Sequence, residues 1–96
     1  MLIKLQPQAR FDSLTVAVQG DVLILNGDPL DFSPLEDGAV LPAKAIGSIW
    51  IAEEVKRVDG AIHVTGMVPH AEDASEAARF PQPISVVADG PVELPK

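Results

Sequence analysis

Residues 49–68 read IWIAEEVKRVDGAIHVTGMV and decide the fold, because two apolar, β-rich runs flank Asp59-Gly60. Asp-Gly is a preferred pair for a type I′ turn, in which both central residues need a positive φ. The stretch therefore predicts a hairpin of two strands, 49–58 and 61–68. A two-residue loop fixes the register, which puts three pairs on a mostly apolar face: Ile51 with Val68, Val55 with Val64, and Arg57 with Ile62. The opposite face is mixed, as in a sheet covered on one side, and pairs Ala52 with Met67, Glu54 with Thr65, and Lys56 with His63.

Another hairpin is expected over residues 14–26, where Gly20-Asp21 separates two apolar runs. Glycine at the first loop position suits a type II′ turn. One face is apolar and pairs Val18 with Leu23, Val16 with Leu25, and Leu14 with Gly27. The second face is only half apolar and pairs Ala17 with Ile24, Gln19 with Val22, and Thr15 with Asn26. Either a second layer of the same chain or a partner chain would cover part of that face.

The remaining apolar runs are short and are punctuated by nine Pro and seven Gly residues. They predict strands over 1–6, 30–33, 84–88 and 91–94, with Pro7 ending the first because proline lacks a ladder donor. Residues 41–47 predict one helical turn, with Pro42 at its first position and Gly47 after its end. Residues 70–79 are acidic and Ala-rich, and are expected to form a loop with at most one or two helical turns. The fold class is therefore all-β: one domain over residues 1–96, built as a small sandwich or open barrel.

Composition excludes several classes of function. Seven Lys and Arg oppose fourteen Asp and Glu, which gives a formal net charge of −7, and cysteine is absent. The scattered basic residues exclude nucleic acid and anionic membrane surfaces as expected partners. No apolar run approaches the ~20 residues of a spanning helix, and no basic segment precedes a long apolar one at the N-terminus. We therefore expect neither a membrane segment nor a signal peptide.

Candidate chemical groups are few. His70 stands near Glu72 and Asp73, but this spacing is more typical of a solvated acidic loop than of a metal site. His63 is a candidate base, although Lys56 opposite it indicates an exposed cross-strand pair, and no serine lies in a nucleophile elbow. Glu53 falls on the apolar face opposite Gly66, which leaves a buried carboxylate as one alternative. A bulge that turns Glu53 and Glu54 outward, or an exposed end of the sheet, is expected instead. We expect no catalytic residue, no cofactor and no metal.

Four residues are candidates for an interface: Trp50, Met67, Val22 and Ile24. Alternation places Trp50 and Met67 on the mixed face of the 49–68 hairpin, and tryptophan is enriched at interfaces. The alternative is that Trp50 packs under the loop over 32–41. Val22 and Ile24 lie on the half-apolar face of the 14–26 hairpin, which makes self-association a further hypothesis.

Several strings along the chain carry a family resemblance. They are GDVLILNG at 20–27, DFSPL at 31–35, GAVLP at 38–42, VDG at 58–60, PH at 69–70 and ADGPV at 88–92. Over residues 14–95, they resemble a family of short proteins encoded by tailed bacteriophages and prophages of Gram-negative bacteria, usually in the tail-gene region. The resemblance implies phage tail proteins as partners and the bacterial host cytoplasm or the virion as location. It transfers no catalytic residue, and the chain departs from the pattern at 71–78.

Two hypotheses follow. The first is a non-catalytic phage or prophage protein, structural or accessory in tail assembly, that acts through protein–protein contacts. The alternative is a small hydrolytic or carbohydrate-binding module that uses His63, His70 or Glu53, and it requires a pocket where these groups converge.

Overall fold

The computed structural model describes residues 1–9, 13–70 and 82–94, without the side chains of Ala9 and His70. The expected loop over 70–79 lies almost wholly outside these ranges. Within these ranges nine strands and one short helix follow one another: β1 (Leu2–Ala9), β2 (Val16–Gln19), β3 (Val22–Leu25), β4 (Asp28–Asp31), β5 (Val40–Leu41), α1 (Ala43–Ile46), β6 (Val55–Val58), β7 (Ala61–His70), β8 (Ile84–Ser85) and β9 (Gly90–Val92). The all-β prediction is confirmed.

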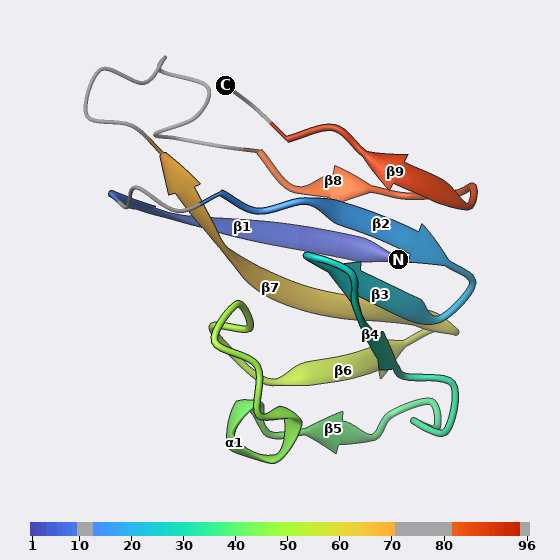
Figure 1. Ribbon diagram of the computed structural model, residues 1–96. Helices are drawn as coiled ribbons and strands as arrows, with labels where there is room; N and C mark the ends of the chain where they lie inside the picture. The colour runs from blue at the N-terminus through green and yellow to red at the C-terminus, as the bar shows by residue number, and fades with distance from the viewer. Residues whose placement is uncertain (10–12, 71–81, 95–96) are drawn as a thin grey trace.

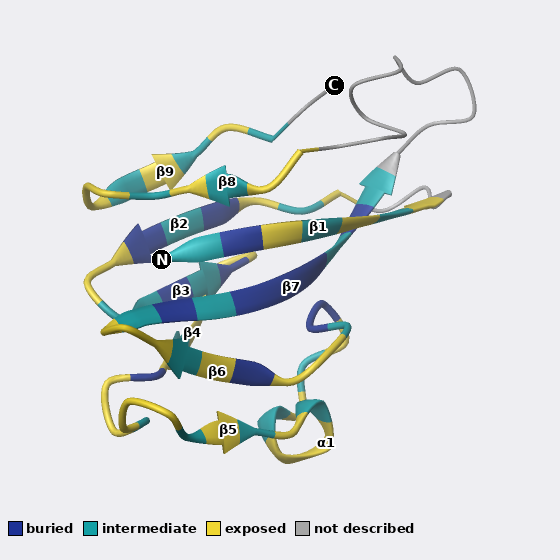
Figure 2. Ribbon diagram, turned by 180° about the vertical axis from the view of Figure 1, so that it is seen from behind, coloured by how far each residue is buried: buried dark blue, intermediate teal, exposed yellow. Residues whose placement is uncertain are grey.

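The strands form two sheets that share one core (Figure 1). Sheet A has the order β5-β6-β7-β1-β8, and sheet B has the order β4-β3-β2-β9. Consecutive strands change sheet from β1 to β2, from β4 to β5 and from β8 to β9. The last two changes join edge strands, and β8 lies beside β9 in both views (Figures 1 and 2). The short strands on either side of Asp89-Gly90 therefore belong to different sheets. In a local hairpin they would instead have paired with each other.

Strand β1 is longer than predicted and lies between β7 and the edge strand β8 in sheet A. It runs through Pro7 to Ala9 and pairs in parallel with β7, with Pro7 aligned to Val68. Only Leu2 and Ile3 pair with β8, so among the described residues Pro7 has a strand neighbour on one side. Proline is tolerated there because its fixed φ suits an extended strand and fewer ladder donors are needed.

The hairpin of β2 and β3 has the predicted register, with Val16 opposite Leu25 and Val18 opposite Leu23. Gly20 alone of the two turn residues has a positive φ, as the type II′ turn requires. A third hairpin follows that the sequence analysis did not identify. Asn26 and Gly27 both have positive φ and join β3 to β4, so this strand begins at Asp28 rather than at residue 30.

The hairpin of β6 and β7 matches the prediction near its turn and departs from it farther away. Asp59 and Gly60 both have positive φ, and Lys56 pairs with His63 as expected. Ile51, however, pairs with Gly66 and not with Val68. Four residues lie between Ile51 and Lys56, whereas two lie between their partners Gly66 and His63, so residues 52–54 bulge out of the ladder.

Because of the bulge, the strand predicted over 49–58 is shorter than expected. The bulge also determines where the two glutamates lie. Regular pairing begins only at Val55, and Trp50 lies outside the strands. Glu53 and Glu54 are both exposed, so the prediction that a bulge turns them outward is confirmed. The predicted helical turn is also present as α1, with Pro42 as its N-cap and Gly47, at φ 73°, as its C-cap.

The core lies between the inward faces of the sheets, as the buried segments in Figure 2 show. It combines residues of β1, β2, β3, β6 and β7 with three residues from the connecting segments: Phe32, Trp50 and Ile51. Its most deeply buried large side chains are Leu23, Val55, Ile62 and Val64. Leu23 comes from sheet B and the other three come from sheet A, so neither sheet buries its apolar face without the other.

Among the described residues, Arg57 forms a polar link between the two sheets. It alternates with Val55 on the inward side of β6, and its side chain is 13% exposed. Its Nη2 donates to the Asp21 carboxylate in the β2–β3 turn at 2.9 Å and to the Phe32 carbonyl at 3.2 Å. Nε donates to the Leu35 carbonyl, and Nη1 donates to the Gly60 carbonyl at 3.0 Å. One guanidinium thus holds a turn of sheet B, the β4–β5 connection and the β6–β7 turn.

We predict that Arg57→Lys lowers the free energy of unfolding by about 2–4 kcal/mol. Lysine keeps the charge but cannot bind four acceptors in fixed directions, which leaves half-buried carbonyls without donors. Asp21→Asn costs less, about 0–1 kcal/mol, because Asp21 is partly exposed. Urea unfolding monitored by Trp50 fluorescence measures these differences.

Lys56→Ala on the same strand is the control. Lys56 is exposed, so the change stays within about 0.5 kcal/mol. Equal stabilities of the Arg57→Lys and Lys56→Ala variants would show that the guanidinium does not link the sheets.

Candidate functional site

The outward face of sheet B carries a continuous apolar row across all four strands. Pro29 of β4 pairs with Ile24 of β3, Ile24 pairs with Ala17 of β2, and Ala17 pairs with Pro91 of β9. Pro29 and Pro91 are exposed, whereas Ile24 and Ala17 are half-buried. Val22 lies two residues before Ile24 on the same face and is half-buried too. We call these five residues the sheet B row.

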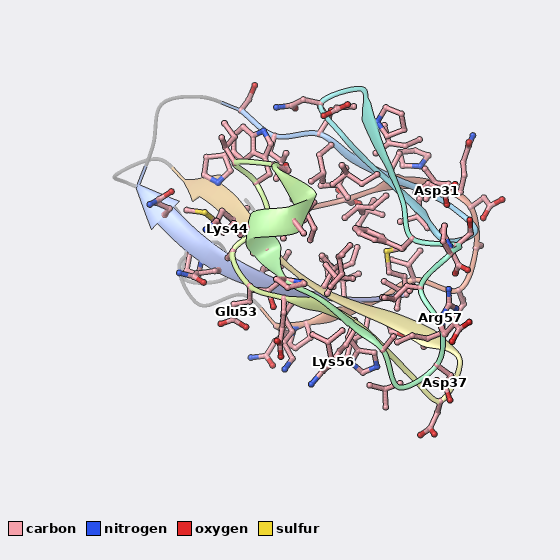
Figure 3. The ribbon with its side chains drawn as sticks, turned by 90° about the horizontal axis from the view of Figure 1, so that it is seen from below. Asp31, Asp37, Lys44, Glu53, Lys56 and Arg57 are labelled. Carbon is pink, nitrogen blue, oxygen red and sulfur yellow. The ribbon has the colours of Figure 1, made fainter. Side chains whose placement is uncertain are left out.

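Acidic residues border this row. Asp31 pairs with Val22 at the β4 edge, and Glu93 follows Pro91 by two residues, so alternation places it on the same face at the β9 edge. Both residues are exposed. In the view from below, Asp31 lies with β4, on the opposite side of the molecule from Glu53 and Lys56 (Figure 3). The sheet B row therefore has an apolar centre and an acidic border.

The Asp31 carboxylate is held in its charged form. Its Oδ1 accepts the backbone N–H of Ser33 at 2.9 Å. This bond, followed by the hydrogen bond from the Ser33 side chain, holds the pKa of Asp31 below its usual value of 3.8. The border of the sheet B row therefore keeps this negative charge at every physiological pH.

The outward face of sheet A is different, because it is polar and carries both signs of charge. It has a shallow open pocket of about 60 Å³, lined by Lys4, Glu53, Glu54, Lys56, His63, Val64 and Thr65. The Thr65 hydroxyl donates to Oε2 of Glu53 at 3.4 Å, and His63 pairs with Lys56 across the ladder. The structure thus brings Glu53 and His63, two of the predicted chemical groups, to the same depression.

This pocket is poorly suited to the hydrolytic and carbohydrate-binding alternatives. Its volume is far below the roughly 300–1,000 Å³ of typical small-molecule sites. Among the described residues that line it, there is no Phe, Tyr or Trp to stack on a sugar ring and no serine, and the hydroxyl group present is that of Thr65. Across residues 1–9, 13–70 and 82–94, no three His, Asp or Glu side chains converge as metal ligands. Glu72 and Asp73 lie outside the described residues, as does the side chain of His70.

The four predicted interface residues fall in different environments. Trp50 is 8% exposed and belongs to the core, so it is not an exposed anchor. It leaves the mixed face because it lies in a turn outside the strands, where the alternation that placed it there does not apply. Met67 is half-buried on the outward side of β7. Val22 and Ile24 lie together in the sheet B row, which also contains three residues that the sequence analysis did not single out: Ala17, Pro29 and Pro91.

Comparisons with known proteins add no relative. No protein family, curated protein or solved structure matches the sequence. Within the described ranges, no helix is both long and apolar enough to span a bilayer. Evidence about function therefore rests on the chain itself.

We predict that Asp31 titrates below pH 3.8 and that Ser33→Ala raises its pKa. The backbone N–H remains in this variant and only the hydroxyl is lost, so the shift is reversed in part. A carboxylate with a depressed folded-state pKa stabilises the fold fully above its unfolded pKa, and this contribution is lost as the pH falls through the folded pKa. NMR titration of the Asp31 carboxyl carbon measures both values, and a wild-type pKa at or above 3.8 would contradict the assignment.

Proposed function

We propose that this protein is a non-catalytic binding protein and that it acts through protein–protein contact at the sheet B row. One observation carries the proposal: an apolar row runs without interruption from Pro29 at one edge of sheet B to Pro91 at the other, on the face turned away from the core. A sheet needs only one apolar face to fold, so this second apolar surface is not required by the core.

The shape of this surface suits a macromolecular partner. It lies on a regular four-stranded sheet, and the small pocket formed by described residues such as Glu53 and His63 is on the other sheet. An apolar centre with a polar border is the usual composition of a protein interface. The edge strands of sheet B are short and carry Pro29 and Pro91, which disfavours pairing with another strand along the edge. Contact through the face is therefore the favoured mode.

The sequence strings at 20–27, 31–35 and 88–92 support a phage or prophage setting for this contact. We propose phage tail proteins as partners, with a structural or accessory role in tail assembly, in the host cytoplasm or within the virion. The first two strings include Val22, Ile24 and Asp31, and the third includes Pro91. The stretches that carry the resemblance thus overlap the proposed interface.

Site-specific photo-cross-linking tests this function. A photoreactive amino acid replaces Ile24 in one variant and Lys56, on the outward face of sheet A, in a matched control. Each is produced in cells that carry the gene in its native genomic setting. We expect a discrete cross-linked protein from position 24 and none from position 56, because only the first lies in the sheet B row.

Mass spectrometry of the cross-linked species identifies the partner, and a tail component would support the proposed setting. Cross-linking from position 56 with none from position 24 would contradict the assigned surface. The absence of any cross-linked protein at position 24 under conditions of tail production would contradict protein–protein contact as the function.

A further inference from the structure

Charge is distributed unequally between the two sheets. The segments that build sheet B, residues 13–31 and 89–94, contain five acidic residues and no lysine or arginine; the acids are Asp21, Asp28, Asp31, Asp89 and Glu93. All four basic residues in the described ranges, Lys4, Lys44, Lys56 and Arg57, lie in sheet A or its connections. Among the described residues, sheet B therefore carries negative charge that its own strands do not balance.

Most of this charge remains available to a partner. Within the described part of the chain, the ion pair between the sheets joins Arg57 to Asp21. Asp89 accepts the backbone N–H of Gly20 at 2.8 Å, and Asp31 accepts that of Ser33, so both carboxylates are fixed in place by neutral donors. Asp31 and Glu93 are exposed at opposite ends of the sheet B row.

The same charge argues against a second copy of this chain as the occupant. A symmetric contact through the sheet B row would bring two acidic borders together, and like charges across an interface oppose association. A partner with an apolar centre and a border of lysine or arginine would meet both features. Such complementarity raises the association rate and rejects acidic competitors.

From this arrangement we propose that the sheet B row binds a protein surface whose apolar centre is bordered by lysine and arginine side chains, with Asp31 and Glu93 as the acidic contacts. This inference rests on the proposed function and adds the chemical class of the partner. In this proposal, the acidic residues at the edges of the row select the partner, and the apolar side chains of the row supply the contact area.

A display selection tests the partner class even while the natural partner is unidentified. The probe is a yeast-displayed library of a small helical scaffold with a randomised surface, selected on the full chain. Enriched clones are expected to carry an excess of lysine and arginine around an apolar centre. Their affinities are then measured for the wild type, for Ile24→Thr, and for the double variant Asp31→Asn with Glu93→Gln. Threonine keeps the β-branched shape that suits a strand, and the amides keep the size of the carboxylates.

The double variant is expected to lose about tenfold in affinity at low salt, since two exposed charge pairs are removed. This difference shrinks to less than about twofold near 1 M salt, where the Debye length is about 3 Å. The matched control, Glu53→Gln with Glu54→Gln, makes the same change of charge on sheet A and leaves the affinity unchanged. Ile24→Thr weakens binding at both salt concentrations.

The remaining outcomes contradict either the proposed partner class, the proposed surface, or both. Clones that need Ile24 but show no basic excess and no dependence on Asp31 and Glu93 would overturn the partner class and leave the proposed surface intact. Clones that do not need Ile24 would overturn both. Equal losses in the sheet A and sheet B charge variants would reduce the effect to net charge. Sedimentation that shows a dimer broken by Ile24→Thr would assign the surface to a second copy instead.

Discussion

The Arg57 guanidinium is the interaction on which the arrangement of the two sheets depends. A chain of 96 residues buries a modest core, so the apolar contact between the inward faces leaves the ends of the sheets to be fixed by other means. At one end, Arg57 joins β6 to the β2–β3 turn and to the β4–β5 connection. Two aspartates extend this link, since Asp37 accepts the N–H of Gly60 and Asp89 accepts that of Gly20. Arg57 and Asp37 lie at this same end of the molecule (Figure 3).

The inward faces of the two sheets are buried in the core, so a partner can contact only their outward faces. These two outward faces differ in polarity and charge. The outward face of sheet A has both signs of charge and a bulge whose glutamates point to solvent. The outward face of sheet B keeps an apolar row between acidic ends. Polar side chains would serve the fold equally well at those row positions. The cost in solubility of leaving them apolar is explained if another protein covers them.

Local turn chemistry made much of this fold predictable. Gly20-Asp21 and Asp59-Gly60 determined two hairpins with their register near the turn. Asn26-Gly27 carried an equally strong signal and, interpreted as a type I′ turn, would have placed Pro29 opposite Ile24. The parallel pairing of β1 with β7 could not be predicted, since no local signal links strands so far apart in the sequence.

The candidate site could also be predicted in part, where it depends on the register of a local hairpin. Val22 and Ile24 could be identified because the hairpin register showed a second apolar face, but Pro91 joins the row through a strand order that the sequence does not encode locally. Trp50 was misplaced because the strand predicted over 49–58 does not reach back to it: Trp50 lies in a turn before Ile51, where strand alternation does not decide which way a side chain points. Arg57 was placed correctly on the inward face, yet three of its four acceptors come from two distant segments, the β2–β3 turn and the β4–β5 connection, and could not be identified from the sequence.

Hydroxyl-radical footprinting of the isolated chain and of the chain in its native assembly tests the central claim most directly. If the sheet B row is the contact surface, Val22 and Ile24 are modified in the isolated protein and protected in the assembly, while His63 and Met67 on sheet A react equally in both. Equal modification of Ile24 in the two states, or protection of the sheet A side chains alone, would contradict the account.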